Sequence, residues 1–426
     1  MAIERNPMAA GENVTAAADP YGAWRHSAYR KFLAGRAIFM IGNQMQTTAV
    51  GWQIYERFGS KLALGYVGLV QIIPVLLLAL PAGHLADRYD RKRIIMAGLG
   101  LFATGSLVLV ALSVWQGPRA WIYAVLFFLA VARIFTMPAI GALLPTVIPR
   151  HLWGNAATWN SSLFELTALA GPAAAGLVIA ATGGTTAVFL TAAACSLASV
   201  GLFSRLKPEQ QASARKAATW SDLVAGLRFV SKTRLLLAAA SLDLFAVLLG
   251  GATALLPVVA KDILHVGPSG FGWLRAAPSI GAASMAIATA HLPPWKRAGR
   301  VLLWAFIGFG SAIIVFGLSR NYWLSMAMLV LTGVFDNLNV VIRQTLVQYI
   351  TPDVMRGRVT AVNFIFIGCS NELGAFESGL TAQWLGTVPA IVAGGMGTLI
   401  VVLAIMRLAP GLRRLGRLQE ISPAPA

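Results

Sequence analysis

Twelve apolar stretches, each long enough to cross a lipid bilayer as a helix, constrain the fold of this chain more than any other feature. A membrane-spanning helix needs about 20 mostly apolar residues. The composition agrees, because 57% of the residues are apolar and only 12% are charged, against about 25% in soluble domains. The sequence therefore predicts an all-α membrane protein with twelve transmembrane helices, near residues 32–55, 62–82, 94–115, 120–143, 160–181, 186–203, 235–259, 270–290, 301–318, 323–343, 359–380 and 388–406.

The positive charges indicate how these helices are oriented. Cytoplasmic loops of membrane proteins carry an excess of Lys and Arg. In the twelve-helix arrangement, 25 of the 34 cationic residues lie in segments expected inside, five in segments expected outside and four within spans. We therefore expect both termini in the cytoplasm. The net charge of +18 could also suggest nucleic-acid binding, but the cations lie in short loops beside apolar spans, so we expect no nucleic-acid partner.

The chain divides into two halves of similar pattern. Residues 29–204 and 235–407 each hold six spans, and residues 205–234 form a polar linker with an amphipathic helix. Residues 1–28 and 408–426 are expected to be cytoplasmic tails. The segment 149–160 aligns with 352–363 at an offset of 203 residues, and this offset also aligns Arg133 with Asp336. Parallel six-helix repeats allow alternating access by rocking of the halves, so we expect two pseudo-symmetric six-helix bundles.

A dense cluster of charge lies between the second and third spans, where residues 83–93 read Gly-His-Leu-Ala-Asp-Arg-Tyr-Asp-Arg-Lys-Arg. This segment resembles the loop between helices 2 and 3 of major facilitator superfamily transporters. In that family the aspartate of the loop caps a neighbouring helix, and its cations help to hold the inward gate shut. The family usually has Gly where Asp90 stands, and we expect Asp90 to keep the tight turn because Asp tolerates left-handed backbone. The resemblance implies a gating role for Gly83, Asp87, Arg88, Arg91 and Lys92.

Further stretches, at residues 42–46 with 51–53, at 351–359 and at 370–379, resemble a narrower group, the bacterial enterobactin (siderophore) exporter family. Residues 167–176 look like the exporter motif of the superfamily, G-x-x-x-G-P-x-x-G-G, matched at Gly171, Pro172 and Gly176. A close-packed helix interface would use the same small residues. The resemblance implies a secondary active exporter of a siderophore or other small amphipathic molecule in the bacterial inner membrane. A multidrug efflux antiporter of the same fold is the alternative.

Ionisable residues inside apolar spans are expensive and are therefore candidates for function. A carboxylate in a cavity can gain and lose a proton as the cavity faces each side, which is the minimum needed to couple transport to a proton gradient. Static ion pairs, such as Arg133 with Glu165 or Asp336 with Arg343, are the alternative interpretation. Arg133 also resembles the helix 4 arginine of the superfamily, which is associated with proton transfer or substrate binding. The proton-coupling candidates are Asp243, Asp336, Glu165, Glu372 and Arg133.

Polar amides within the spans predict a wet substrate cavity between the halves. The candidates to line it are Asn43, Gln46, Gln71, Asn337 and Asn339. A siderophore would take hydrogen bonds from such groups, whereas an amphipathic drug would use the same cavity with aromatic contacts. The sequence leaves both cargoes open.

Other classes of protein lack support in the sequence. The five histidines have no partner set for acyl transfer in a membrane-embedded enzyme, and no metal-ligand spacing occurs. No phosphate-binding Gly-rich loop with its Lys is present, so we expect no cofactor and a proton gradient as the energy source. A passive channel fits less well than a gated central site, because the charged residues are spread over helices of both halves. We expect a monomer that meets only its small-molecule substrate and lipid.

Overall fold

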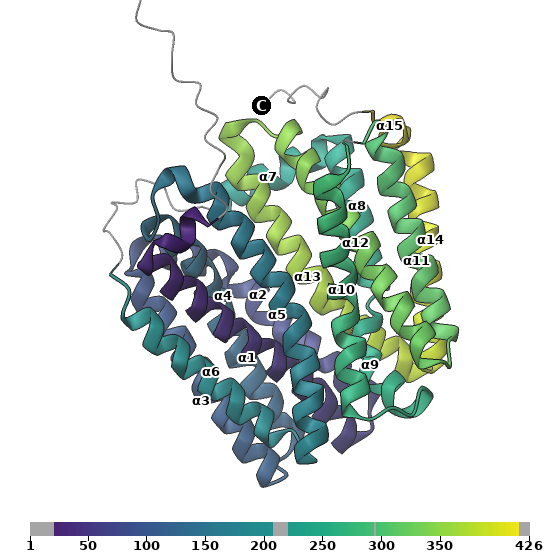
Figure 1. Cartoon of the computed structure of the whole chain (residues 1–426). Helices are drawn as coiled ribbons and strands as arrows, with labels where there is room; N and C mark the ends of the chain where they lie inside the picture. The colour runs from purple at the N-terminus through teal and green to yellow at the C-terminus, as the bar shows by residue number, and fades with distance from the viewer. Residues whose placement is uncertain (1–20, 208–219, 294, 417–426) are drawn as a thin grey trace, which may run out of the picture.

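The computed structural model describes residues 21–207, 220–293 and 295–416, and every regular element in these ranges is a helix (Figure 1). Six long helices come from the first half and six from the second. Those of the first half are α1 (Ser27–Phe58), α2 (Lys61–Arg88), α3 (Arg91–Val114), α4 (Arg119–Leu143), α5 (Trp153–Thr182) and α6 (Thr186–Ser204). Those of the second half are α8 (Arg234–Leu249), α10 (Pro268–His291), α11 (Ala298–Leu318), α12 (Tyr322–Ile350), α13 (Asp353–Leu385) and α14 (Thr387–Leu408).

By length and composition, ten helical segments of the described chain could cross a membrane. The two long helices outside this set are α1 and α10. Helix α1 carries Arg36, Asn43, Gln44 and Gln46, and α10 is rich in Gly, Ser and Ala. Helix α1 packs against α5 and α6, and α10 packs against α5 and α12, and polar residues of both helices line cavities inside the protein.

The helix contacts of the first half recur in the second half. Helix α3 packs on α4 and α6, as α11 packs on α12 and α14. Helix α2 packs on α4, as α10 packs on α12, and α1 packs on α5 and α6, as α8 packs on α13 and α14. The predicted pair of pseudo-symmetric six-helix bundles is therefore present.

The two bundles meet through two equivalent helix pairs, α2 with α13 and α5 with α10. Each pair contains facing glycines. A Cβ at Gly176 would lie 2.8 Å from the Cα of Gly272, and a Cβ at Gly379 would lie 2.6 Å from the Cα of Gly65. Gly176 and Gly379 are related by the 203-residue offset. Since small residues let helix backbones approach closely, these glycines permit the contact between bundles, at the end of the molecule opposite α7 and α15 (Figure 1).

Exposed tryptophans mark a boundary at that same end. They lie where α3 and α13 end and where α4 and α12 begin. Tryptophan is enriched at membrane–water interfaces because its ring is apolar and its N–H is polar. The four are Trp115, Trp121, Trp323 and Trp384.

Most of the charged segment 83–93 is helical and not the loop that the sequence suggested. Helix α2 continues to Arg88 and α3 begins at Arg91, so only Tyr89 and Asp90 separate them. The expectation of a left-handed turn at Asp90 is wrong, because its φ is −58°. Its side chain instead accepts a hydrogen bond from the backbone N–H of Lys92 at 2.9 Å, so Asp90 caps the N-terminus of α3.

The seventh span is also interrupted, whereas the sequence suggested one helix over residues 235–259. Helix α8 ends at Leu249, and a 3₁₀ turn (Ala252–Leu255), α9 (Leu256–Val258) and a π-helix (Val259–Ile263) follow. Gly250 and Gly251 disfavour helix, and a Cβ at Gly251 would lie 2.8 Å from the carbonyl oxygen of Gly374. The break therefore brings the chain close to α13.

The amphipathic helix α7 (Trp220–Lys232) connects the two bundles in the sequence. It lies at the end of the molecule that also holds α15 (Pro410–Arg414) (Figure 1). Asp222 of α7 pairs with Arg358 of α13, with 2.8 Å between Oδ1 and Nε. A Cβ at Gly226 would lie 2.8 Å from the carbonyl oxygen of Arg358. The linker helix is therefore packed tightly on the start of α13.

Candidate functional site

An ion pair joins the two bundles partway along α4 and α13. Arg133 of α4 lies with its Nη2 at 2.8 Å from Oε1 of Glu372 in α13. The side chains are 35% and 15% exposed, so the pair is partly open to solvent. Arg275 of α10 also interacts electrostatically with Glu372. The pairing of Arg133 with Glu165, one of the alternatives raised by the sequence, does not occur.

Beside this ion pair, the first bundle holds a small polar cavity of about 40 Å³. Three of the expected cavity residues, Asn43, Gln46 and Gln71, line it together with Arg133. Gln46 is buried and accepts a hydrogen bond from the hydroxyl of Ser106. Polar groups of α1, α2 and α4 therefore converge on one side of the Arg133–Glu372 pair.

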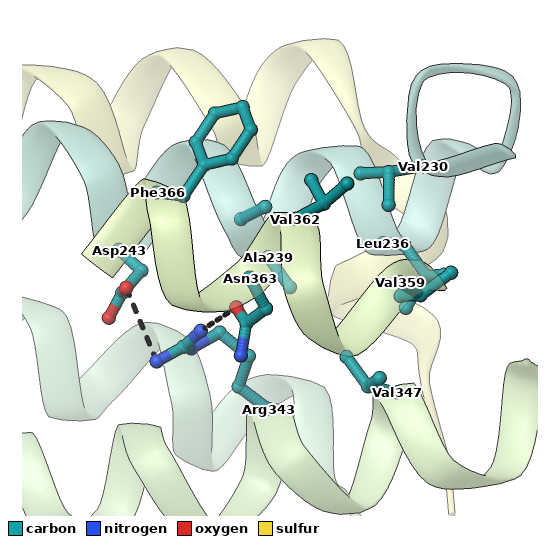
Figure 2. A pocket seen from close by; sticks show the side chains of 11 residues that line it. Val230, Leu236, Ala239, Asp243, Arg343, Val347, Val359, Val362, Asn363 and Phe366 are labelled. Atoms are coloured by element: carbon teal, nitrogen blue, oxygen red, sulfur yellow. Dashed lines mark hydrogen bonds and ion pairs between the residues drawn. The ribbon is translucent and has the colours of Figure 1, made fainter. Parts of the chain in front are cut away.

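The second bundle contains a buried charged cluster at a pocket that Val230 of α7 also lines (Figure 2). Nη2 of Arg343 lies 3.3 Å from Oδ2 of Asp243, and the side chains are 4% and 9% exposed. Arg343 also donates through Nη1 to Oδ1 of Asn363, and Asn339 donates through Nδ2 to Oδ1 of Asp243 at 2.7 Å. Apolar side chains, among them Val230, surround the cluster and a cavity of about 30 Å³.

The pairing of Asp336 with Arg343 is thus also wrong. Seven residues correspond to about 10 Å along a helix, and Asp243 of the neighbouring α8 lies much closer to Arg343. Asp243, a proton-coupling candidate, is therefore part of this buried cluster. Asn339 was expected to line the substrate cavity, but its amide nitrogen donates a hydrogen bond to Asp243. Asn337 is partly buried and does not line the cavities described here.

A larger cavity, of about 280 Å³, lies between α5 and the second bundle. Glu165 of α5 and Asp336 of α12 both line it. In the part of the chain that the structure describes, neither carboxylate has a cation within ion-pair distance. Asp336 occupies the repeat position of Arg133, so related positions in the two bundles carry opposite charges.

Two residues of the expected gate connect helices within the first bundle. Arg91 donates to the carbonyl oxygen of Ala142 near the end of α4 at 3.0 Å. Lys92 donates to the carbonyl oxygens of Ser204 and Leu206 at the end of α6, at 2.6 and 2.7 Å. Cations at helix C-termini are favourable because they satisfy free carbonyls and the helix dipole. The side chains of the other three gating candidates, Gly83, Asp87 and Arg88, lie outside the described part of the structure.

The motif in α5 serves two different interfaces. A Cβ at Gly171 would lie 2.4 Å from the Cβ of Gln44, so Gly171 faces α1 of the same bundle. The carbonyl of Pro172 and the backbone of Gly176 face Gly272 of α10 in the other bundle. The helix-packing candidates therefore lie both within and between bundles.

Several polar contacts were not identified from the sequence. Arg36 of α1 donates to Oδ1 of Asn160 at 3.0 Å, as Arg343 donates to Asn363, and the two asparagines share the 203-residue offset. Tyr55 of α1 donates to Asp262 of the π-helix and so links the bundles beside the facing glycines. For the contacts of Arg36 and Arg343, the sequence did show an arginine within an apolar span, which must find a polar partner. No pattern in the sequence indicated the contact of Tyr55 with Asp262.

Metal-ligating side chains do not gather in the described part of the molecule. Within residues 21–207, 220–293 and 295–416 there is no group of three or more His, Cys, Asp or Glu side chains placed to hold a metal ion. The charged groups of the interior are instead paired with, or face, one another across helices.

The fold and the charged interface between its bundles define a transporter of the major facilitator type. Solved structures of such transporters share the fold. A bacterial homologue of the human lysosomal transporter Spinster, in an inward-facing and unoccupied conformation, is similar at TM-score 0.73 with 15% identity, over 91% of this chain and 97% of that chain. The nucleoside transporter NupG is similar at TM-score 0.70 with 11% identity, over 89% and 98% of the two chains.

Residues 18–420 match the family described as transmembrane secretion effector, and the chain therefore belongs to this family of the major facilitator superfamily. Among curated relatives, the multidrug efflux pump Tap of Mycolicibacterium fortuitum is 28% identical over 88% of this chain and 93% of the relative. The enterobactin exporter EntS of Citrobacter koseri is 26% identical over 91% and 93% of the two chains.

Proposed function

We propose that this protein is a proton-coupled exporter of small molecules in the inner membrane of a bacterium, working as a monomer by alternating access. Both termini lie in the cytoplasm, as the distribution of Lys and Arg favours. The proton gradient supplies the energy, and no cofactor, enzymatic step or nucleic acid takes part. Relatives named as a multidrug efflux pump and an enterobactin exporter support export.

The contacts between bundles support an inward-facing state. The facing glycines Gly176 and Gly272, and the hydrogen bond from Tyr55 to Asp262, lie at the end opposite α7. With the termini in the cytoplasm, this is the outer end of the protein. Cargo would then reach the interior from the cytoplasm, as an exporter requires.

The observation that carries the coupling is the ion pair of Arg133 with Glu372, because it joins one bundle to the other. When a proton binds Glu372, its carboxylate becomes neutral and the attraction to Arg133 is lost. The energy of the contact between bundles therefore depends on protonation. A ligand that differs in affinity for two conformations shifts their populations, and here the ligand is a proton.

The role of Glu372 can be tested in proteoliposomes. Uptake of the fluorescent cation rhodamine 123 and of a radiolabelled catecholate siderophore is measured in parallel, with and without an imposed pH gradient. We expect Glu372→Gln to abolish accumulation driven by the pH gradient while exchange at equal pH persists. Glu377→Gln is the matched control, since Glu377 hydrogen-bonds Thr381 of its own helix and lies outside the cavities described above.

Two outcomes separate the parts of the proposal. Accumulation by Glu372→Gln equal to the wild-type level would show that this carboxylate does not couple transport to protons. If the wild-type protein moved neither compound against a gradient, export of these two classes of cargo would be excluded.

A further inference from the structure

The cavity that holds Glu165 and Asp336 differs in charge from the rest of the interior. The arginines nearest to it have other partners: Arg133 pairs with Glu372, Arg275 interacts electrostatically with Glu372, and Arg343 pairs with Asp243. Arg343 attracts Asp336 only from beyond ion-pair distance, and within the described chain no cation stands at ion-pair distance from Glu165 or Asp336. Unpaired charges are costly inside a membrane protein and favour a ligand of the opposite sign.

We propose that this cavity binds the positively charged group of an amphipathic organic cation, with Asp336 and Glu165 as its charge partners and the side-chain carbonyl of Asn339 as a hydrogen-bond acceptor. The inference rests on the proposed function, because it names the class of cargo that the exporter carries. It favours an amphipathic drug over a siderophore, the two cargoes that the sequence leaves open.

Asn339 supplies an observation independent of the two carboxylates. The residue is 2% exposed, its Nδ2 donates to Asp243, and its side chain also interacts with Asp336. Because a carboxylate can only accept, this bond fixes which end of the amide is the oxygen. Oδ1 is buried without a hydrogen-bond partner in the described structure.

The residue lines a small recess that opens beside the larger cavity. Val247, Phe309 and Asp336 line both the recess and the cavity, so the two spaces adjoin. An acceptor without a partner, next to a carboxylate, is suited to an N–H donor such as a protonated amine. A second anion at this position would leave Oδ1 of Asn339 unsatisfied.

The remaining walls fit the apolar part of such a ligand. Phe164 of α5 and Phe309 of α11 both line the cavity, and their rings offer cation–π as well as apolar contact. Thr253, Ser279 and Thr332 add hydroxyl groups, and a cavity of about 280 Å³ accommodates a small organic molecule. A catecholate siderophore, which is anionic, would be repelled by both carboxylates.

Two dyes of the same ring skeleton and opposite charge test the inference. Rhodamine 123 is a cation with amino groups, and fluorescein is an anion. Binding of each to the purified full-length protein in detergent is measured by fluorescence anisotropy, so the readout does not depend on transport. We expect rhodamine 123 to bind and fluorescein not to bind.

Variants connect the binding to the cavity. We expect Asp336→Asn and Glu165→Gln each to weaken rhodamine 123 binding by about tenfold or more, and Asp336→Glu to restore most of it. Glu377→Gln, which removes a carboxylate outside the cavity, should bind as the wild type does. Asn371→Lys should abolish binding, because it adds a cation to the wall from an exposed position that tolerates a longer side chain.

Each contrary result overturns the assignment. These are fluorescein binding as tightly as rhodamine 123, no binding of either dye, or unchanged rhodamine 123 affinity in Asp336→Asn and Asn371→Lys. Failure of the proposed function has a different signature, because rhodamine 123 would then bind with the expected charge dependence but would not accumulate in proteoliposomes. Accumulation of the catecholate siderophore together with no dye binding would overturn the cation site and leave export intact.

Discussion

At the scale of single residues, neighbours decide what a charge in the interior does. Asp243 and Arg343 are almost fully buried and hold one another, with Asn339 and Asn363 completing the hydrogen bonds. A buried pair of this kind contributes little over apolar packing but is strongly destabilising when one partner is removed. This cluster therefore stabilises the second bundle in one arrangement of α8, α12 and α13.

Removing one member of that cluster should be costly. We expect Arg343→Gln to destabilise the protein by about 3–5 kcal/mol, because Asp243 would be left buried and unpaired. The matched control is Arg356→Gln, whose partner Asp353 is exposed, and the change there should be within about 1 kcal/mol. Unfolding by SDS in mixed micelles measures both.

The double variant Asp243→Asn with Arg343→Gln tests whether the cost of the single change comes from leaving one charge unpaired. It should be less destabilised than the sum of the two single changes, since no charge is then unpaired. Strict additivity would show that the side chains act through packing and not through their ion pair.

At the scale of helices, contact between the bundles depends on glycines that come in symmetric positions. Gly176 faces Gly272 across α5 and α10, and Gly379 faces Gly65 across α13 and α2. At such positions backbone meets backbone, so even one methyl group has no flexible neighbour to displace. Glycine is otherwise unfavourable inside a helix, which makes its use here a consequence of packing.

We expect Gly176→Ala to destabilise the protein by about 1–3 kcal/mol, because its Cβ would lie 2.5 Å from the carbonyl oxygen of Pro268. Gly379→Ala should behave in the same way, since it occupies the related position. Gly201→Ala is the control: a Cβ there meets open space, so the variant should be neutral or more stable by about 0.5–1 kcal/mol. Midpoints of thermal unfolding in detergent would distinguish them, and equal midpoints for Gly176→Ala and Gly201→Ala would contradict the close approach.

At the scale of the whole molecule, two polar links join the bundles at different depths. The pair of Arg133 with Glu372 lies partway along α4 and α13, and the bond of Tyr55 to Asp262 joins the last turn of α1 to the π-helix after α9. Alternating access requires the contacts at one end to open while those at the other end form. The Tyr55–Asp262 bond should therefore stabilise the conformation seen here relative to the opposite one.

Loss of that bond should shift the population toward opening at the end opposite α7. Spin labels at Glu56→Cys and His265→Cys, both exposed, report the separation of α1 from the segment after the π-helix. We expect Tyr55→Phe to increase the fraction of long distances, by about fivefold if one net hydrogen bond of roughly 1 kcal/mol is lost. The same change at Tyr349, an exposed residue, should leave the distances unaltered, and equal distributions for both variants would rule out a role for the bond.

Much of the architecture could be predicted from the sequence by itself. The twelve long helices, the division into halves and the 203-residue repeat follow from where apolar residues stand along the chain, because burial in lipid is a property of each segment. The resemblance at residues 83–93 and 167–176 indicated the superfamily. The ends of the helices and the break after Leu249 were harder to predict from the sequence, since they depend on caps and on contacts with α13.

The partners of the charges were decided only by the tertiary structure. Arg133 and Glu372 are 239 residues apart in the chain, and Arg343 prefers Asp243 of another helix to Asp336 of its own. The sequence identified which residues are ionisable at membrane depth but not which faces of neighbouring helices meet. An ion pair forms only when packing brings two side chains within a few ångströms, and that distance exists in the assembled bundles and not in the order of residues.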